Sequence, residues 1–266
     1  MYSNHLLICG APRSGTTALA HAIRRRYPLI TNELLPYLQL TTQPTYADTA
    51  DAISKRTKNR WGFDVDHAAE GVEDDLSFLA KYNKVLSDAL SDEHSYFEDK
   101  DDVQRTELVS KLDVYEHSHR YVGDKAPVYA TAVADIAARF PEIKVIYIQR
   151  DGREVAGSLL RLKWKRTTRS AFKHWLHYVN TWHGAKQYVN HIEIENAELL
   201  SNPAAVAEKV NKFLDDDIPE EYFNDVIVKL GADGLRETSV GYWSRFFKQE
   251  AIPEDALSRL QQLGYC

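Results

Sequence analysis

The sequence predicts an α/β fold with a central, mainly parallel sheet of four or five strands flanked by helices. The apolar run His5–Cys9 precedes a glycine-bracketed loop and a segment with helical spacing. A second apolar run rich in β-branched residues, Lys144–Gln149, also leads into a helical segment. Further helical segments separate these runs along the chain. Strands that alternate with helices are typical of parallel sheets, because the helices form the crossover connections.

Length and composition narrow the class of protein. The 266 residues are expected to form a single domain, 1–266, because one core grows to about 250–300 residues before chains divide. A net charge of −6, with 33 basic residues scattered along the chain, argues against nucleic acid as a partner. Cys9 and Cys266 lie at opposite ends, so we expect no disulfide and a cytoplasmic location. No apolar run approaches the roughly 20 residues of a membrane span, and no signal sequence is expected.

The loop after the first strand is a predicted phosphate loop. Gly10 and Gly15 bracket four residues, as in the pattern G-x-x-x-x-G-K-[ST]. Thr16 stands where nucleotide triphosphatases have lysine, and a different cation, Arg13, lies within the loop. Such a loop suits a terminal group of modest charge better than a Mg²⁺-bound triphosphate. The alternative is a glycine-rich strand-to-helix turn that binds nothing.

Two further residues follow predicted strands. Glu33 comes just after the extended segment 29–31, so it is a candidate general base, or else a glutamate at a helix start or on the surface. Lys125 lies where the extended segment 120–125 turns into a helix predicted over 128–140. Ligands of open α/β sheets bind at such strand ends, although an exposed lysine is the alternative interpretation.

A second anion site is predicted after the strand 144–149. Arg150 stands at the end of this strand, and Ser158 lies two turns into the following helix. A guanidinium paired with a hydroxyl suits an isolated phosphate group. Either residue alone would favour the ordinary interpretation, an exposed strand-end arginine or a helix serine, whereas the two together favour the anion site.

The region 39–119 loses strand character and predicts a helical insertion that covers a site and selects the substrate. Its acidic runs are expected to be solvated helix starts. A long helix is predicted over 169–189, a strand over 191–194 and a helix over 204–214. The long helix carries an apolar stripe that predicts a core face and not a stacking surface for bases. Its members are Phe172, Trp175, Val179 and Trp182.

The hexapeptide Pro12–Thr17 closely resembles the 5′-phosphosulfate loop of sulfotransferases that use 3′-phosphoadenosine-5′-phosphosulfate (PAPS). The resemblance implies that the loop holds the 5′-phosphate and the sulfuryl group. The implied residues are Arg13, Ser14, Gly15, Thr16 and Thr17. Gly123-Asp124-Lys125-x-Pro127 is similar to a segment of this family whose lysine approaches the phosphosulfate bridge.

Other blocks occur in the order of the same family. The resemblance implies that Arg150 and Ser158, eight residues apart, bind the 3′-phosphate. Arg236 lies in a segment similar to the family's C-terminal nucleotide loop and would clamp the same phosphate. Glu237-Thr238 departs from the family's Lys-Gly in that loop, which leaves Arg245 or Lys248 as replacements. Asn196 and Ala197 replace the family's Tyr-Glu pair, so no tyrosine contact is implied.

The resemblance also bears on the general base. In branches similar to the tyrosylprotein enzymes, a glutamate about twenty residues after the basic residue of the loop is the base, as Glu33 is after Arg13. Other branches use histidine, so three histidines remain rival candidates: His94, His117 and His119.

The implied function is transfer of a sulfuryl group from PAPS to a hydroxyl, in preference to an amine, of a small molecule, carbohydrate or peptide. The implied mechanism is an in-line displacement without a metal ion, with Glu33 as base and with Lys125 and Arg13 stabilising the departing 3′,5′-bisphosphate (PAP). Two alternatives stand: a P-loop kinase that uses ATP and Mg²⁺, and a nucleotide-binding protein of the same fold without catalysis. The sequence specifies neither the acceptor nor the oligomeric state.

Overall fold

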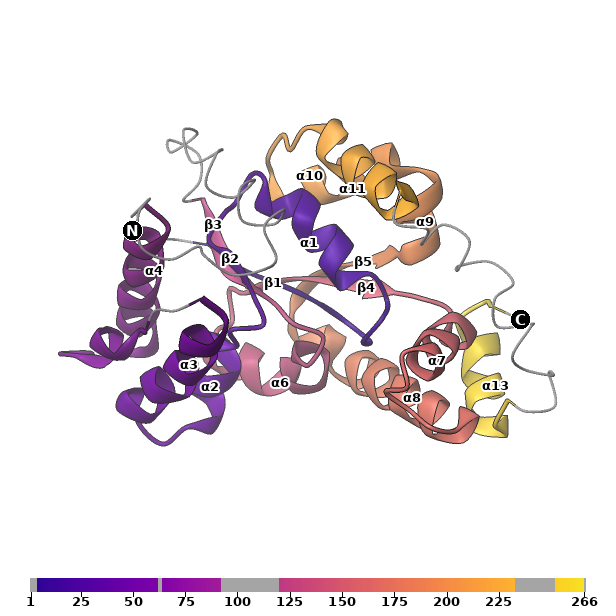
Figure 1. The fold of residues 1–266 in the computed structure, drawn as a ribbon, viewed down its shortest axis with the longest axis horizontal. Coiled ribbons are helices and arrows are strands. Elements are labelled where there is room, and N and C mark those ends of the chain that lie inside the picture. The colour runs from indigo at the N-terminus through magenta and orange to yellow at the C-terminus, as the bar shows by residue number, and fades with distance from the viewer. Residues whose placement is uncertain (1–3, 62–63, 92–119, 233–251, 266) are drawn as a thin grey trace. The chain divides into compact units, whose positions relative to one another are not determined.

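A computed structural model describes residues 4–61, 64–91, 120–232 and 252–265 (Figure 1). They contain a parallel sheet of five strands with the order β2-β3-β1-β4-β5, flanked by helices, which confirms the predicted fold class. The strands are β1 (Asn4–Gly10), β2 (Ile30–Asn32), β3 (Tyr121–Lys125), β4 (Lys144–Gln149) and β5 (Asn190–Glu195). Every helix in the described ranges is too short or too polar to span a lipid bilayer.

The chain divides into two compact units, each drawn from several segments. The first unit comprises Met1–Leu7, Arg24–Ala126 and Asp135–Lys144. The second unit comprises Ile8–Ile23, Pro127–Ala134 and Val145–Cys266.

In the first unit, β2 and β3 pair in parallel, with Thr31 opposite Asp124 and Asn32 opposite Lys125. This register fixes which residues meet where the two strands end. The helices that follow β2 confirm helical character in the first part of the predicted insertion 39–119, whereas 92–119 lies outside the described residues. These elements are α2 (Pro36–Thr42), α3 (Tyr46–Trp61), the 3₁₀ helix η1 (Asp66–Ala69) and α4 (Asp75–Ser91).

In the second unit, local capping explains where several helices begin. The Asp151 carboxylate accepts a hydrogen bond from the Arg153 N–H and caps α7 (Gly152–Arg161). Thr167 and Ser170 form a reciprocal capping box at the start of α8 (Thr168–Ala185). The long helix predicted over 169–189 ends at Ala185, where a 3₁₀ turn, η2 (Lys186–Tyr188), replaces it. The helices are α7 (Gly152–Arg161), α8 (Thr168–Ala185), α9 (Asn196–Ser201), α10 (Pro203–Leu214), α11 (Glu220–Ala232) and α13 (Glu254–Gln262).

Two further helices have their residues divided between the units. α1 (Thr16–Arg24) follows β1, and α6 (Tyr129–Arg139) follows β3 close to the predicted segment 128–140. Each has residues in both units.

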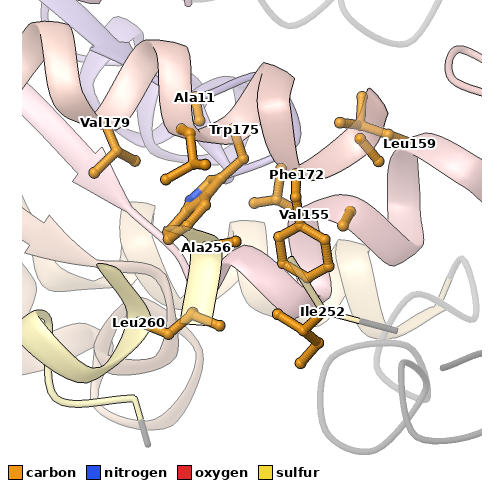
Figure 2. Close-up of a cluster of buried hydrophobic side chains, with 12 residues drawn as sticks. Ala11, Val155, Leu159, Phe172, Trp175, Val179, Ile252, Ala256 and Leu260 are labelled. Atoms are coloured by element: carbon orange, nitrogen blue, oxygen red, sulfur yellow. The ribbon is translucent and has the colours of Figure 1, made fainter. Parts of the chain in front are cut away.

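A buried apolar cluster in the second unit anchors the elements that bear site residues. Figure 2 shows α7, α8 and α13 contributing side chains to it, with Ala11 of the phosphate loop packed among them. Trp175 and Phe172 are 0 % exposed, which confirms the predicted core stripe. Because Ala11 and Val155 share this cluster, the packing that holds α7 also supports the phosphate loop.

His5 makes the first unit sensitive to acid. Its Nδ1 lies 2.9 Å from the Tyr37 hydroxyl oxygen, and burial lowers the pKa of His5 to about 4. The unfolded chain, with a His pKa near 6.5, therefore binds the additional proton first as the pH falls. The resulting loss of stability develops between about pH 6.5 and pH 4 and amounts to about 2–3 kcal/mol near pH 4.5.

We therefore expect His5→Gln to lose less stability than the wild type on acidification. The measurement is the free energy of unfolding from urea titrations at about pH 7 and about pH 4.5. Equal losses in the two proteins would contradict the assignment.

Candidate active site

The phosphate loop is folded by its own hydrogen bonds. The Ser14 N–H donates to the Ala11 carbonyl at 3.0 Å, and the Ser14 hydroxyl donates to the same oxygen. Ser14 is 0 % exposed, so its side chain lies inside the loop. Arg13, directly before it, adopts a left-handed backbone with φ of 73°, which is uncommon for a residue with a side chain. The loop thus holds Arg13 in a strained and specific orientation.

The phosphate loop leads directly into the N-terminus of α1. The first-turn amides of a helix have no partner within the helix, and the helix dipole makes this end attractive to anions. Gly15, which immediately precedes α1, has φ of 100°, a region that favours glycine. The carboxamide of Asn196 packs against its Cα, where a Cβ would collide with it. Thr16 is buried and Thr17 is exposed in the first turn of α1.

Arg13, Arg150 and Ser158 lie together in the second unit. The Arg13 Nε–H donates to Ser158 Oγ at 3.1 Å, and Arg150 Nη1 donates to the Arg13 carbonyl at 2.9 Å. The Arg13 guanidinium also lies 5.7 Å from the centre of the Trp164 ring, within the range of a cation–π contact. The residue predicted for the 5′-phosphosulfate and the two predicted for the 3′-phosphate therefore form a single contiguous cluster in the structure.

The charges of this cluster favour the binding of an anion. The pKa of Arg13 is lowered by burial first, and then by repulsion from Arg150 and Arg161. Arg13 forms no ion pair with any carboxylate of the described chain. Arg150 has a partner, because its Nε lies 2.7 Å from Glu154 Oε2. A partly buried arginine with cationic neighbours and no carboxylate is stabilised when an anion binds beside it.

Glu33 and Lys125 form an ion pair in the first unit. Lys125 Nζ lies 3.2 Å from Glu33 Oε1, and the Glu33 N–H donates to the Lys125 carbonyl at 2.8 Å. The Lys125 side chain is 3 % exposed, whereas that of Glu33 is 37 % exposed. Burial lowers the pKa of Lys125, and the neighbouring Glu33 carboxylate opposes this shift. The pair thus joins a buried cation to a carboxylate that solvent reaches.

Several candidates fall outside the described residues. They are the rival bases His94, His117 and His119 and the nucleotide-loop residues Arg236, Glu237, Thr238, Arg245 and Lys248. Within the described residues, no group of three or more His, Cys, Asp or Glu side chains is arranged to hold a metal ion.

Comparison with known proteins decides the family. A family model described as the sulfotransferase family matches residues 5–220. The chain belongs to this family. The resemblance drawn from the phosphate loop and the later motifs is therefore confirmed at the level of the sulfotransferase family. No curated protein matches the sequence.

Solved sulfotransferase structures share the fold at low sequence identity. The sulfotransferase domain from the olefin synthase of Synechococcus PCC 7002 superposes with a TM-score of 0.59 at 18 % identity, over 99 % of this chain and 94 % of that one. The sulfotransferase domain from the curacin biosynthetic pathway gives 0.59 at 15 % identity, over 100 % and 99 %. Sulfotransferase STF9 from Mycobacterium avium gives 0.50 at 16 % identity, over 98 % and 77 %.

Sequence reasoning missed two residues of this sulfotransferase that lie at the loop. Trp164 stands among basic residues after α7, and nothing in that pattern indicates a contact with Arg13. In the sequence, Asn196 is only a departure from the family's tyrosine, yet its side chain packs on Gly15. Both contacts arise from tertiary packing, so no local spacing reveals them.

Proposed function

We propose that this sulfotransferase moves a sulfuryl group from PAPS to a hydroxyl acceptor. The observation that supports the proposal is the cationic cluster at the phosphate loop, in which Arg13 has no carboxylate partner among the described residues. PAPS carries anionic groups on the 3′ and 5′ oxygens of its ribose, and the cluster supplies two guanidiniums beside a helix N-terminus.

The 3′-phosphate is assigned to Arg150 and Ser158. Ser158 Oγ accepts from Arg13 in the free protein, which leaves the hydroxyl hydrogen available to a phosphate oxygen. The 5′-phosphosulfate is assigned to Arg13 and the amides of Gly15, Thr16 and Thr17. Ser14 shapes the loop by its bond to the Ala11 carbonyl. We retain Arg236, outside the described residues, as a further 3′-phosphate ligand.

The proposed chemistry is an in-line displacement at sulfur. The acceptor oxygen forms a bond to sulfur while the bond from sulfur to the 5′-phosphate oxygen breaks, and PAP leaves with that electron pair. Glu33, the exposed member of its ion pair, takes the acceptor proton. Lys125 and Arg13 are assigned to the negative charge that develops on the departing phosphate. Cations of the chain therefore suffice for the proposed step.

The proposal also covers the class of acceptor and the cellular location of the enzyme. The acceptor is a small molecule, carbohydrate or peptide, and the location is cytoplasmic, in keeping with the free, buried Cys9. We expect radiolabelled PAPS, incubated with the protein and an extract of its source cells, to label one acceptor that can be isolated. Release of labelled inorganic sulfate alone would contradict an acceptor-directed transferase.

Nucleotide preference distinguishes this proposal from a P-loop kinase. PAP at about 100 times its Kd should stabilise the protein by about 2.7 kcal/mol. The melting temperature should then rise by roughly 5–10 °C in the presence of EDTA. ATP with Mg²⁺ should give a smaller rise, because Thr16 replaces the P-loop lysine. A response to ATP with Mg²⁺ that exceeds the response to PAP would favour the kinase.

A further inference from the structure

Asp124 is a fully buried carboxylate beside the site, at 0 % exposure in β3. Its Oδ1 accepts hydrogen bonds from the Thr31 hydroxyl at 2.7 Å and from the Leu34 N–H at 3.3 Å. Its Oδ2 accepts from the Leu35 N–H at 2.9 Å. Three donors from one short segment satisfy a carboxylate that would otherwise be costly to bury. Asp124 is therefore bound to the turn that follows β2.

This turn has an unusual backbone. Glu33 and Leu35 are left-handed, with φ of 60° and 64°, although neither is glycine. Non-glycine residues keep a left-handed conformation only where several surrounding contacts fix it, and they are concentrated at functional sites. Here the Glu33 N–H is held by the Lys125 carbonyl at 2.8 Å, and Arg56 Nη1 lies 3.4 Å from the Glu33 carbonyl. Asp124 holds the next two amides, so the peptide groups around Glu33 are held on both sides.

We propose that Asp124 is a positioning residue that sets the Glu33 carboxylate for proton transfer. It acts through the amides of Leu34 and Leu35 and does not touch the substrate. The inference rests on the proposed function, in which Glu33 is the base. Proton transfer requires heavy atoms about 2.6–3.2 Å apart, and a displacement of about 1 Å can cost roughly a hundredfold in rate. The same β3 end also carries Lys125, so one dipeptide presents the cation and orients the base.

Two substitutions in the same buried cluster separate positioning from stability. Asp124→Asn keeps the size of the side chain but replaces one carboxylate oxygen with an NH₂ group, which donates hydrogen bonds. The side chain can then no longer accept hydrogen bonds at both of its polar atoms. Thr31→Val removes the hydroxyl bond and leaves both turn amides with their acceptor. We expect both variants to melt at lower temperature. Only Asp124→Asn should speed hydrogen exchange at Leu34 and Leu35.

The rate of transfer is measured with radiolabelled PAPS as the varied substrate and the source-cell extract as acceptor. Asp124→Asn should lower the apparent kcat roughly ten- to hundredfold and leave the KM for PAPS and the Kd for PAP unchanged. Thr31→Val should keep the kcat of the wild type. If Asp124→Asn does not fold, Asp124→Ser is assayed by the same criteria.

The deciding comparison is the double variant Glu33→Gln/Asp124→Asn. If Asp124 acts through Glu33, the double variant has the rate of Glu33→Gln alone. A further loss of rate in the double variant would overturn the positioning role. An Asp124→Asn variant that stays active, while the Glu33→Gln variant is inactive, would also overturn the positioning role. This result would leave the proposed function intact. An active Glu33→Gln would reject both the base assignment and the positioning role.

Discussion

Glu33→Gln is expected to bind PAP with the affinity of the wild type and to lose sulfuryl transfer by roughly 10²–10⁴-fold, the usual contribution of a general base. Glutamine keeps the shape of glutamate but cannot take the acceptor proton. The Kd for PAP should be unchanged because the nucleotide is assigned to other residues. The measurements are calorimetric titration with PAP and transfer from radiolabelled PAPS to the acceptor.

Glu33→Asp is the matched variant. It retains a carboxylate on a side chain one methylene shorter, so it should recover part of the rate that Glu33→Gln loses. An unchanged rate in Glu33→Gln would transfer the role of base to the histidines outside the described residues. Single substitutions would then identify the base among His94, His117 and His119.

Arg150→Gln is expected to weaken PAP binding by roughly thirtyfold, which corresponds to about 2 kcal/mol for a lost charge-assisted hydrogen bond. Its effect on adenosine 5′-phosphate, which lacks the 3′-phosphate, should be far smaller. The difference arises because Arg150 is assigned to the 3′-phosphate, although it also supports the loop through the Arg13 carbonyl. The two affinities are measured by calorimetry in EDTA.

Glu154→Gln is the control for this prediction. It removes the carboxylate 2.7 Å from Arg150 but leaves the guanidinium in place. Since the carboxylate competes with the phosphate for the same cation, PAP should bind Glu154→Gln at least as tightly as the wild type. Equal losses for PAP and adenosine 5′-phosphate in Arg150→Gln would remove Arg150 from the 3′-phosphate site.

Local patterns predicted the fold class and placed several candidate site residues on the strand ends and helices where the structure has them. The apolar run before Gly10 and the run Lys144–Gln149 are β1 and β4, because burial of a parallel strand leaves a short apolar segment in the sequence. Arg150 and Ser158 were predicted at a strand end and in the following helix, and the structure places them after β4 and in α7. Such features depend on neighbours in the chain and are therefore visible in the sequence.

Long-range contacts explain what the sequence did not predict. Arg13 and Ser158 are 145 residues apart, and Glu33 and Lys125 are 92 residues apart. The pairing of Glu33 with Lys125 depends on the parallel register of β2 and β3, which no local spacing specifies. The left-handed turn at Glu33 and Leu35 contains no glycine that would predict it from the sequence. Its conformation is instead fixed by hydrogen bonds to Asp124 and to the end of β3.

The most direct test of the account is a crystal structure of the protein with PAP. We predict one nucleotide whose 5′-phosphate lies on the amides of Gly15–Thr17 and whose 3′-phosphate contacts Arg150 and Ser158. A nucleotide bound elsewhere, or a 3′-phosphate that faces solvent while Arg150 remains on Glu154 alone, would contradict the assignment of PAPS as the sulfuryl donor.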